Sequence, residues 1–516
     1  MANEFYLPLV SDVGIRRDGT LFDSSMHNAG SWMRSYRSRP QKIGGWQLIA
    51  NGNYDIPRTL YNYDSDGFSY IYIGRSSSIS FLQVFPDLVA SAESSTTPLN
   101  FLANPQNNFI FDSVTYIQSE GEDDVQVVYV VCAYAPNLTD VGNTVERPVL
   151  YNVLGANTPF QEMINSETGN SMTTSGGVVV VSKFVIIYGR GGVIRWNDGS
   201  DFETWPSENF VQMGTSKFIA AAPTRSGNTA SALFWSLNSV VIGSINDAGT
   251  GFNFAYVSTR TTLLSSKCVA SFDPCFYWVG NDSFWQYNGA VQELPNEVNK
   301  KWFFDNINPN CKGKTYAYVN TQWNEFWVVF CKGTSTEPNW AIFCNLQTGS
   351  WSDTDQIDRG AAIPSGSIVP YPIMTSSKGV QYGGNIIYPM YVHEIGTDQV
   401  QFGVTSPIVA SIESRYFNLW KDNPAAKVLE IDSVIFDIQQ SGNMYFYIRY
   451  LGYPNSVVRQ SDNFDFVNTD EFKTVRIKGS IFSITFVSNV IGGNFVMGNT
   501  MLLMNATDDQ RPGPTT

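Results

Sequence analysis

The apolar positions of this chain come in short runs that are separated by polar turns. Residues 178–188 are almost all apolar and rich in β-branched side chains, which predicts a buried strand. The glycine-rich run 189–192 then turns the chain, and residues 193–196 begin a second strand. Asn197-Asp198-Gly199 predicts a tight turn, because these residue types accept positive φ and bond the nearby backbone. Together with Trp205, the segment predicts the outer half of a four-stranded antiparallel blade.

The same order of strand, polar turn and tryptophan recurs along the chain. The segments 283–291 and 343–353 repeat it, the first with Asn288-Gly289 as its turn. Further apolar runs lie at 68–74 and 79–85, 109–118 and 125–134, 218–222 and 231–245, 268–279, 314–318, 326–331 and 340–345. Their spacing is on the order of 40–50 residues, the length of one propeller blade. The pattern therefore predicts an all-β fold, a β-propeller of four-stranded antiparallel blades with a C-terminal β-rich extension.

The pattern changes after Gly403. Long alternating segments at 427–439, 444–451, 472–477 and 480–487 predict a small sandwich-like unit or strands added to the propeller. We therefore expect an N-terminal arm with a basic cluster over residues 1–50, a β-propeller over 51–408 and a C-terminal β-rich segment over 409–516.

Composition and charge agree with an all-β chain and narrow the function classes. Aromatic residues make up 14% of the 516 residues and charged residues only 15%, a balance that suits strands and turns more than helices. The net charge of −14 disfavours tight nucleic-acid binding through a general field, since Lys and Arg supply that affinity. No apolar run reaches the roughly 20 residues of a membrane-spanning helix. The six cysteines include no C-x-x-C pair, so we expect reduced buried thiols without zinc or redox chemistry.

Candidate catalytic groups are sparse. Only His27 and His393 could serve a histidine-based triad or metal site, and neither stands beside a nucleophile motif. Two carboxylates could act as in a glycosidase, or several could hold calcium, although no segment matches the EF-hand loop. Acids gather in three predicted turns, where they are common as solvated turn formers. The three groups are Asp198, Asp201 and Glu203; Glu120, Glu122, Asp123 and Asp124; and Asp353, Asp355 and Asp358. We expect no enzyme, no cofactor and no metal.

Aromatic and glycine-rich segments suggest further binding chemistry. The 13 tryptophans could stack on sugars or nucleobases, but in an antiparallel sheet they more often pack between neighbouring blades. The run 189–192 resembles a phosphate cradle, which needs a following helix. Because the residues after it are strand-like, a hairpin turn is the favoured interpretation.

A basic cluster lies in the N-terminal stretch. Arg34, Arg37, Arg39 and Lys42 fall within nine residues that contain no acid. The favoured interpretation is that they pair with acidic surface of this chain or of a neighbour. The alternative is contact with DNA or with an adjacent ring of another protein. All four residues are candidate assembly contacts.

Three stretches resemble the β-propeller nozzle proteins of short-tailed bacteriophages, also called tail hub or packaged-DNA stabilisation proteins. They are GSWMRSYRSRPQKIGGW (30–46), WNDGSDFETW (196–205) and FCNLQTGSW (343–351). Chain length and the order of segments are also similar. The resemblance implies a structural virion protein at the tail tip. It forms a homohexameric ring below the adaptor ring, closes the tail tube, retains packaged DNA and becomes the channel for genome ejection.

The resemblance also implies partners and leaves competing hypotheses open. The partners are further copies of the chain, tail adaptor proteins, tail fibre or spike proteins, duplex DNA in transit and the host cell surface. Because an acidic ring repels duplex DNA, we expect a low-friction conduit and not a DNA-binding site. One alternative is a carbohydrate-binding or carbohydrate-degrading receptor-recognition tail protein, for which Asp201 and Glu203 are the carboxylates to test. A cellular scaffold propeller is the third hypothesis, but it usually shows a more regular repeat signature.

Overall fold

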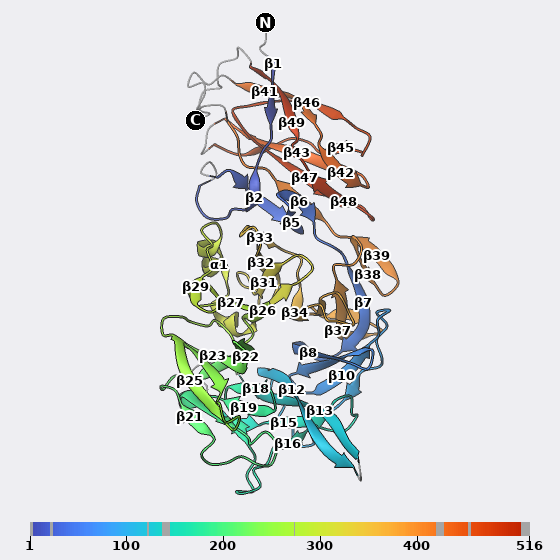
Figure 1. The fold of residues 1–516 in the computed structure, drawn as a ribbon. Coiled ribbons are helices and arrows are strands. Elements are labelled where there is room, and N and C mark those ends of the chain that lie inside the picture. Colours follow the sequence, from blue (N-terminus) through green and yellow to red (C-terminus); the bar gives the residue numbers. More distant parts are fainter. Residues whose placement is uncertain are drawn as a thin grey trace.

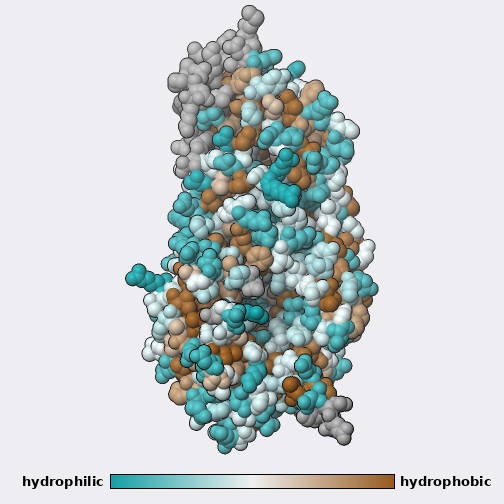
Figure 2. All heavy atoms as spheres, in the orientation of Figure 1, coloured by the Kyte–Doolittle hydropathy of each residue, from teal (hydrophilic) through white to brown (hydrophobic). Residues whose placement is uncertain are grey.

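The computed structural model describes residues 4–20, 24–120, 123–136, 145–272, 274–418, 428–452 and 456–506. These residues form an all-β molecule with an elongated outline (Figure 2), with a propeller at one end and a sandwich-like domain at the other (Figure 1). Helix within these ranges is limited to α1 (Lys300–Asn306) and the 3-10 turns η1 (Arg190–Gly192) and η2 (Pro309–Lys314). None of the helices in the described part of the chain is long and apolar enough to cross a membrane.

Seven sheets form the propeller: six four-stranded antiparallel sheets and a seventh, longer one in which one strand pair is parallel. The first six blades are β8 (Pro57–Ser65), β9 (Phe68–Arg75), β10 (Ile79–Val84) and β11 (Ser94–Ser95); β12 (Asn107–Glu120), β13 (Asp123–Pro136), β15 (Leu150–Val153) and β16 (Gln161–Glu162); β18 (Gly177–Val181), β19 (Phe184–Tyr188), β20 (Val193–Trp196) and β21 (Phe210–Gln212); β22 (Phe218–Ser226), β23 (Thr229–Ser236), β24 (Val240–Ile245) and β25 (Phe252–Ser258); β26 (Val269–Phe272), β27 (Cys275–Val279), β28 (Phe284–Tyr287) and β29 (Val291–Glu293); and β30 (Tyr316–Asn320), β31 (Glu325–Phe330), β32 (Trp340–Asn345) and β33 (Trp351–Thr354). The strands β14 (Arg147–Pro148) and β17 (Thr173–Thr174) form a small separate pair. The predicted all-β propeller of four-stranded blades is confirmed.

The seventh blade takes one strand from the beginning of the chain. Its later strands are β34 (Arg359–Ile363), β35 (Ile373–Ser376) and β37 (Asn385–His393), and β7 (Trp46–Asn53) pairs antiparallel with β37. β36 (Val380–Tyr382), β38 (Asp398–Gln401) and β39 (Val404–Pro407) extend this sheet. The first strands of the blades are neighbours around the ring, and β34 contacts β8 where the ring closes. The first and last parts of the propeller are thus joined by strand pairing within blade seven.

The third blade departs from one prediction. The run 178–188 is not a single strand, because β18 and β19 form a hairpin whose turn holds Ser182 at a φ of 57°. Both strands are buried along their whole length, so apolarity alone did not separate them. The predicted strand at 193–196 is β20, and it follows the glycine-rich turn as expected. Gly199 has the positive φ, 82°, that the predicted tight turn requires.

A second domain, which we call the terminal domain, contains strands from both ends of the chain and lies beyond the rim of the propeller (Figure 1). One sheet is β1 (Glu4–Pro8), β49 (Met501–Ala506), β41 (Leu429–Ile435) and β46 (Phe472–Gly479). A second is β4 (Ala29–Ser31), β40 (Ala410–Glu413), β47 (Ile481–Ser488), β43 (Met444–Leu451), β44 (Arg459–Gln460) and β45 (Phe464–Phe466). A third is β42 (Ile438–Ser441), β48 (Asn494–Met497), β6 (Arg39–Lys42) and β5 (Met33–Tyr36). β2 (Asp12–Ile15) and β3 (Met26–His27) pair in parallel.

The N-terminal stretch 1–50 is therefore not a separate arm. Among its described residues, β1, β4 and β6 pair with the C-terminal strands β49, β40 and β48. The expected boundary near residue 50 falls inside β7, which belongs to the propeller. A local pattern does not reveal this arrangement, because each strand pairs with a partner hundreds of positions away.

One hydrophobic core runs across the junction between the two domains. It joins Trp32 of the terminal domain to Trp327 and Phe343 of blade six, and continues to Phe446 and Phe482 between the terminal sheets. Trp327 and Phe343 stack with their ring centroids 4.2 Å apart. Because the junction is filled with buried apolar side chains, the terminal domain is packed against the propeller and not tethered to it by a linker.

Candidate functional site

The predicted basic cluster divides into a buried pair and an exposed pair. Arg34 and Lys42 are 1% and 5% exposed, whereas Arg37 lies at the surface in the turn between β5 and β6 and Arg39 lies at the surface at the start of β6. Lys42 pairs with Met33 and Arg34 pairs with Gln41, so the two buried residues lie at the end of the hairpin that is covered by the rest of the chain, whereas Arg37 and Arg39 lie at its turn end.

Arg34 lies in a buried ion-pair network between the terminal domain and blades six and seven. Its Nε is 3.0 Å from Glu325 Oε1, and its Nη1 donates to Glu394 Oε2 at 2.8 Å. Its guanidinium also lies over the Trp323 ring, 4.4 Å from the centroid. Burial raises the pKa of the Glu325 carboxyl to about 7, although the nearby Arg34 opposes this shift. The carboxylates of Glu325 and Glu394 thus share the Arg34 guanidinium at the junction between the two domains.

Lys42 is fixed inside the terminal domain. Its Nζ donates to the carbonyl oxygen of Gly493 at 2.7 Å, and burial lowers its pKa to about 8. Lys42 and Arg34 are therefore poorly placed to be assembly contacts, because both side chains are buried within this chain. For Arg34, pairing with acids of the chain itself is the interpretation that the structure bears out.

A second set of hydrogen bonds and ion pairs connects the terminal domain to the propeller near blades five and six. Both carboxylate oxygens of Asp18 accept backbone N–H groups at the start of α1, from Lys301 at 2.9 Å and Trp302 at 2.8 Å. Next to it, Arg17 makes a two-point ion pair with the buried Asp353 of blade six, at 2.8 and 2.9 Å. Neither Asp18 nor Arg17 was singled out in the sequence, because their partners lie about 280 to 340 positions away.

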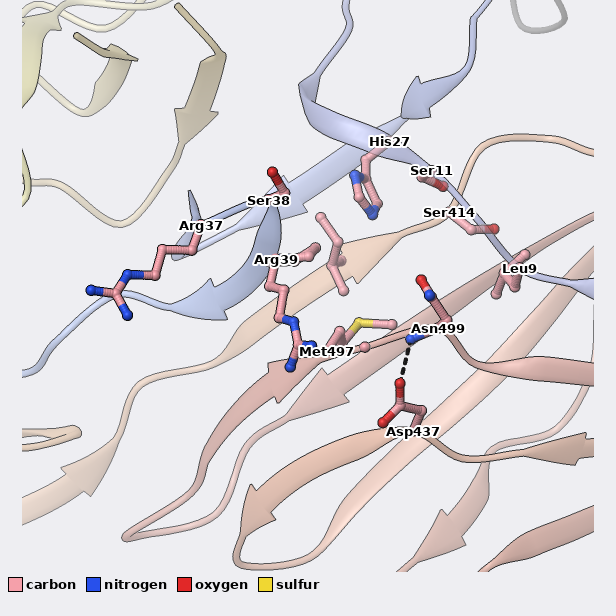
Figure 3. Close-up of a pocket in the computed structure, with 13 residues that line it drawn as sticks. Leu9, Ser11, His27, Arg37, Ser38, Arg39, Ser414, Asp437, Met497 and Asn499 are labelled. Carbon is pink, nitrogen blue, oxygen red and sulfur yellow. Dashed lines mark hydrogen bonds between the residues drawn. The ribbon is translucent and has the colours of Figure 1, made fainter. Parts of the chain in front are cut away.

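Arg37 and Arg39 border a pocket in the terminal domain. The turn that carries them has Arg37 at φ 47° and Ser38 at φ 61°, a conformation that L-residues adopt at a cost. The pocket has a volume of about 280 Å³ and is also lined by His27, Asp437 and other residues of the terminal domain. In Figure 3, Arg39 extends toward Met497 and Asp437, whereas Arg37 extends away from the other residues. Arg37 is therefore the residue of the predicted cluster best placed to contact another molecule.

Polar side chains cross the axis of the propeller at one end. Lys267, which precedes blade five, donates from Nζ to the carbonyl oxygen of Arg58 in blade one at 3.0 Å. Arg58 in turn pairs with Glu337 of blade six at 2.8 Å, and Glu337 also pairs with Lys314 at 2.6 Å. Since blades one and five lie on nearly opposite sides of a seven-bladed ring, these contacts bridge the central channel. Side-chain contacts therefore cross the axis of a single propeller at this end.

The carboxylates between Trp196 and Trp205 form turns, as predicted. Asp198 Oδ1 accepts from the backbone N–H of Ser200 at 2.8 Å, and Asp201 Oδ1 accepts from that of Glu203 at 2.7 Å. Trp196 packs between blades, with its ring 5.5 Å from that of Phe252 in blade four. The interpretation of this segment as blade architecture is confirmed.

The other predicted acid groups differ in their surroundings. The prediction of a solvated turn is wrong for Asp353, which is fully buried in β33 and paired with Arg17. Asp355 follows blade six and accepts a hydrogen bond from the hydroxyl of Ser31 in β4, so it too connects the propeller to the terminal domain. Asp358 lies directly before β34. In the second group, Asp124 is exposed, while Glu122 and the side chains of Glu120 and Asp123 lie outside the described residues.

Neither histidine has the surroundings of a catalytic base. Burial lowers the pKa of His27 to about 4, and burial together with Arg359 places the pKa of His393 well below its usual range. Arg359 Nε donates to His393 Nε2 at 2.8 Å, so this imidazole serves as an acceptor inside blade seven. Within the described residues, no group of three or more histidine, cysteine or acidic side chains is placed to hold a metal ion.

Comparisons with known proteins add little beyond the fold. No family model matches the chain, and no curated protein matches it. Among solved structures, it is similar to an exo-β-1,3-galactanase from Phanerochaete chrysosporium in complex with galactose, at 9% identity and a TM-score of 0.26, over 90% of this chain and 100% of that one. It is also similar to a chain of the mitotic checkpoint complex, at 11% identity and a TM-score of 0.35, over 67% and 94% of the two chains.

Proposed function

We propose that this chain is a non-enzymatic structural subunit of a phage virion, located at the tail tip. In this role it forms the nozzle or hub ring that closes the tail tube, retains packaged DNA and provides the channel for genome ejection. The observation that carries the proposal is the junction between the two domains. Strands from both ends of the chain form the terminal domain, and this domain is packed against a propeller whose ring is closed by strand pairing. A subunit of this kind transmits load through buried packing and ion pairs and not through a flexible linker.

The proposed conduit lies at the centre of a ring of subunits. The axis of the single propeller is bridged by Lys267, Arg58 and Glu337, so it is not the passage for a duplex. With a net charge of −14 per chain, a homohexameric ring repels the phosphate backbone of DNA and leaves it free to slide.

Ring formation requires two different patches that meet between neighbours. Arg37 supplies one candidate, since it carries an exposed positive charge on an acidic protein. The hairpin of β12 and β13 supplies another, because it extends beyond blade two and exposes Ile117 and Val125. Between Tyr129 and the tip of the hairpin, β13 pairs only with β12 among the described strands, and the hairpin projects from the propeller in Figure 1. Tail adaptor proteins and tail fibre or spike proteins are the further partners of this proposal, and the host cell surface is the target.

Electron microscopy of negatively stained protein, alone and mixed with its adaptor, tests the proposal. We expect closed rings of six subunits. The variant Arg37→Glu should weaken ring or adaptor assembly, whereas Arg190→Glu should not, since Arg190 is an exposed arginine on the propeller that pairs with Glu146. A chain that stays monomeric even with the adaptor present would overturn the proposal.

The carbohydrate-degrading alternative has less support. Asp201 already accepts the backbone N–H groups of Glu203 and Thr204 within its own turn, at 2.7 and 2.8 Å. We therefore expect Asp201→Ala and Glu203→Ala to leave host-polysaccharide turnover unchanged in a reducing-sugar assay. A polysaccharide-cleaving activity that either variant abolishes would revive the alternative.

A further inference from the structure

The outer strands of the four-stranded blades differ in length. Five of the six blades end in strands of two to four residues, which are β11, β16, β21, β29 and β33. Blade four ends in β25, which has seven residues. Short edge strands are a common protection against unwanted pairing with other chains. Blade four lacks this protection, and β25 lies at the outside of the propeller (Figure 1).

The free edge of β25 is regular over most of its length. The strand pairs with β24 in an unbroken antiparallel register from Phe252 opposite Ile245 to Tyr256 opposite Val241, and the one irregularity follows Tyr256. Among the described strands, β24 is its only partner. In an antiparallel pair, every second residue of a strand turns both its N–H and its C=O to the far side. The edge of β25 therefore presents a row of backbone donors and acceptors that matches another extended strand.

The side chains of β25 also favour strand addition. None of its seven residues is charged, and none is proline. Phe252, Phe254 and Tyr256 alternate along the strand and share one face. The first two pack against Trp196 of blade three, with ring centroids 5.5 and 5.8 Å from that of the indole. Tyr256 is 49% exposed. A strand beside β25 thus meets a row of aromatic rings that blade three holds in place.

Two other strand edges show the protection that β25 lacks. β33 is buried along its whole length, and its Asp353 pairs with Arg17. β46 has eight residues, but three of them are basic and its pairing with β41 is interrupted by a register shift. Charges and bulges both oppose the addition of a further strand. The long, uncharged and regular edge of β25 is therefore suited to a partner.

We propose that the β25 edge binds an extended segment of another polypeptide, which adds a fifth strand to blade four through main-chain hydrogen bonds. The segment is uncharged and has apolar side chains at alternate positions, for the aromatic face of β25. Its other side chains are small or polar, for the face of Asn253 and Ala255. The choice of another polypeptide over a second copy rests on the proposed ring, since pairing of β25 with itself is two-fold and does not close a ring of six.

Fluorescence anisotropy of a labelled peptide on the full-length chain tests the edge. The probe alternates valine and threonine over about eight residues, enough to span β25, and ends in lysine for solubility. We expect a Kd on the order of 100 μM. Two versions of the probe carry N-methyl groups on alternate amides. The version whose methyl groups face β25 should bind about tenfold more weakly, whereas the other should bind like the parent.

Hydrogen–deuterium exchange and one pair of variants locate the binding. The probe should slow exchange in the proteolytic fragment that contains β25 and leave β21, the outer strand of blade three, unchanged. Tyr256→Ala should weaken binding by about two- to fivefold, since it removes a cross-strand side-chain contact. Phe210→Ala is the matched control, because Phe210 is a comparably exposed aromatic residue, 51%, on β21.

The proposal is overturned if the unmodified peptide does not bind, if both N-methylated versions bind as well as the parent, or if the protection from exchange falls outside β25. It is also overturned if sedimentation shows a dimer of the chain that Tyr256→Ala dissociates, since a second copy then occupies the edge. Failure to form rings would count against the proposed function and would leave the peptide result unchanged.

Discussion

Arg34 pairs with the carboxylates of both Glu325 and Glu394 at the junction between the two domains, and this pairing makes the stability of the protein depend on pH. Burial raises the pKa of Glu325 to about 7, well above the ordinary value of a glutamate. The folded chain therefore holds a proton that the unfolded chain releases near pH 4.5, and the stability contributed by this group is lost as pH rises from about 4.5 through 7. Glu325→Gln removes the titration, while its amide oxygen still accepts from Trp327 Nε1. We expect the variant to be at least as stable as the parent at pH 8 and to show a flatter pH dependence.

Chemical unfolding between pH 5 and pH 8 measures this effect. Glu413→Gln is a suitable control, because Glu413 is another buried carboxylate, paired with Arg449 in the terminal domain, and its replacement leaves the Glu325 titration in place. An unchanged pH slope in Glu325→Gln would show that the proton is held elsewhere.

Only part of this residue chemistry was predictable from the sequence. The cluster of Arg34, Arg37, Arg39 and Lys42 was visible, but the partners of Arg34 lie 291 and 360 positions away. No local pattern distinguishes a buried arginine with distant acids from an exposed one. The turn-forming role of Asp201 was predictable, because its hydrogen bonds are made within its own segment.

Among the structural elements, α1 depends on a residue from the other domain. Its own N-cap, Asn299, makes no side-chain capping bond, and Asp18 accepts the N–H groups of Lys301 and Trp302 instead. We expect Asp18→Ala to lower the free energy of unfolding by about 1–2 kcal/mol, the usual effect of losing a cap. Asp305→Ala removes an exposed carboxylate from the same helix and should cost no more than about 0.5 kcal/mol. Equal unfolding midpoints for the two variants would contradict the capping role.

The strand β7 closes the propeller and should be sensitive to substitution at Gly52. This glycine has a φ of 73°, and a Cβ on it would lie 1.9 Å from the carbonyl oxygen of Tyr388 in β37. Gly67 has a similar φ of 80° but open space around it. Gly67→Ala should therefore cost about 1 kcal/mol from the backbone alone, whereas Gly52→Ala should cost about 3 kcal/mol or more. Thermal melts of both variants measure the difference. If Gly52→Ala is as stable as Gly67→Ala, the pairing of β7 with β37 can shift to make room for the added methyl group.

The strands themselves were largely predictable, and their connections were not. Apolar runs with polar turns gave the hairpins β9–β10 and β12–β13 with nearly correct bounds. The hairpin of β18 and β19 was missed, since both strands are buried on both faces and only Ser182 and Lys183 interrupt them. The closing strand β7 was assigned to an arm, because its place in blade seven depends on pairing across more than 300 positions.

At the scale of the whole molecule, charge and architecture together lead to a prediction about DNA. Three of the positive charges are used within the chain, as Arg34, Arg17 and Arg58 show by their ion pairs with Glu325, Asp353 and Glu337. The chain has a net charge of −14, which disfavours general attraction to the phosphate backbone of a duplex. We expect duplex DNA to bind more weakly than about 1 μM at physiological salt, for the isolated chain and for its assembled ring. Fluorescence anisotropy with a labelled duplex measures this, with a basic DNA-binding protein as the positive control. Submicromolar binding by the ring would show that the conduit binds the duplex and would contradict the passive channel.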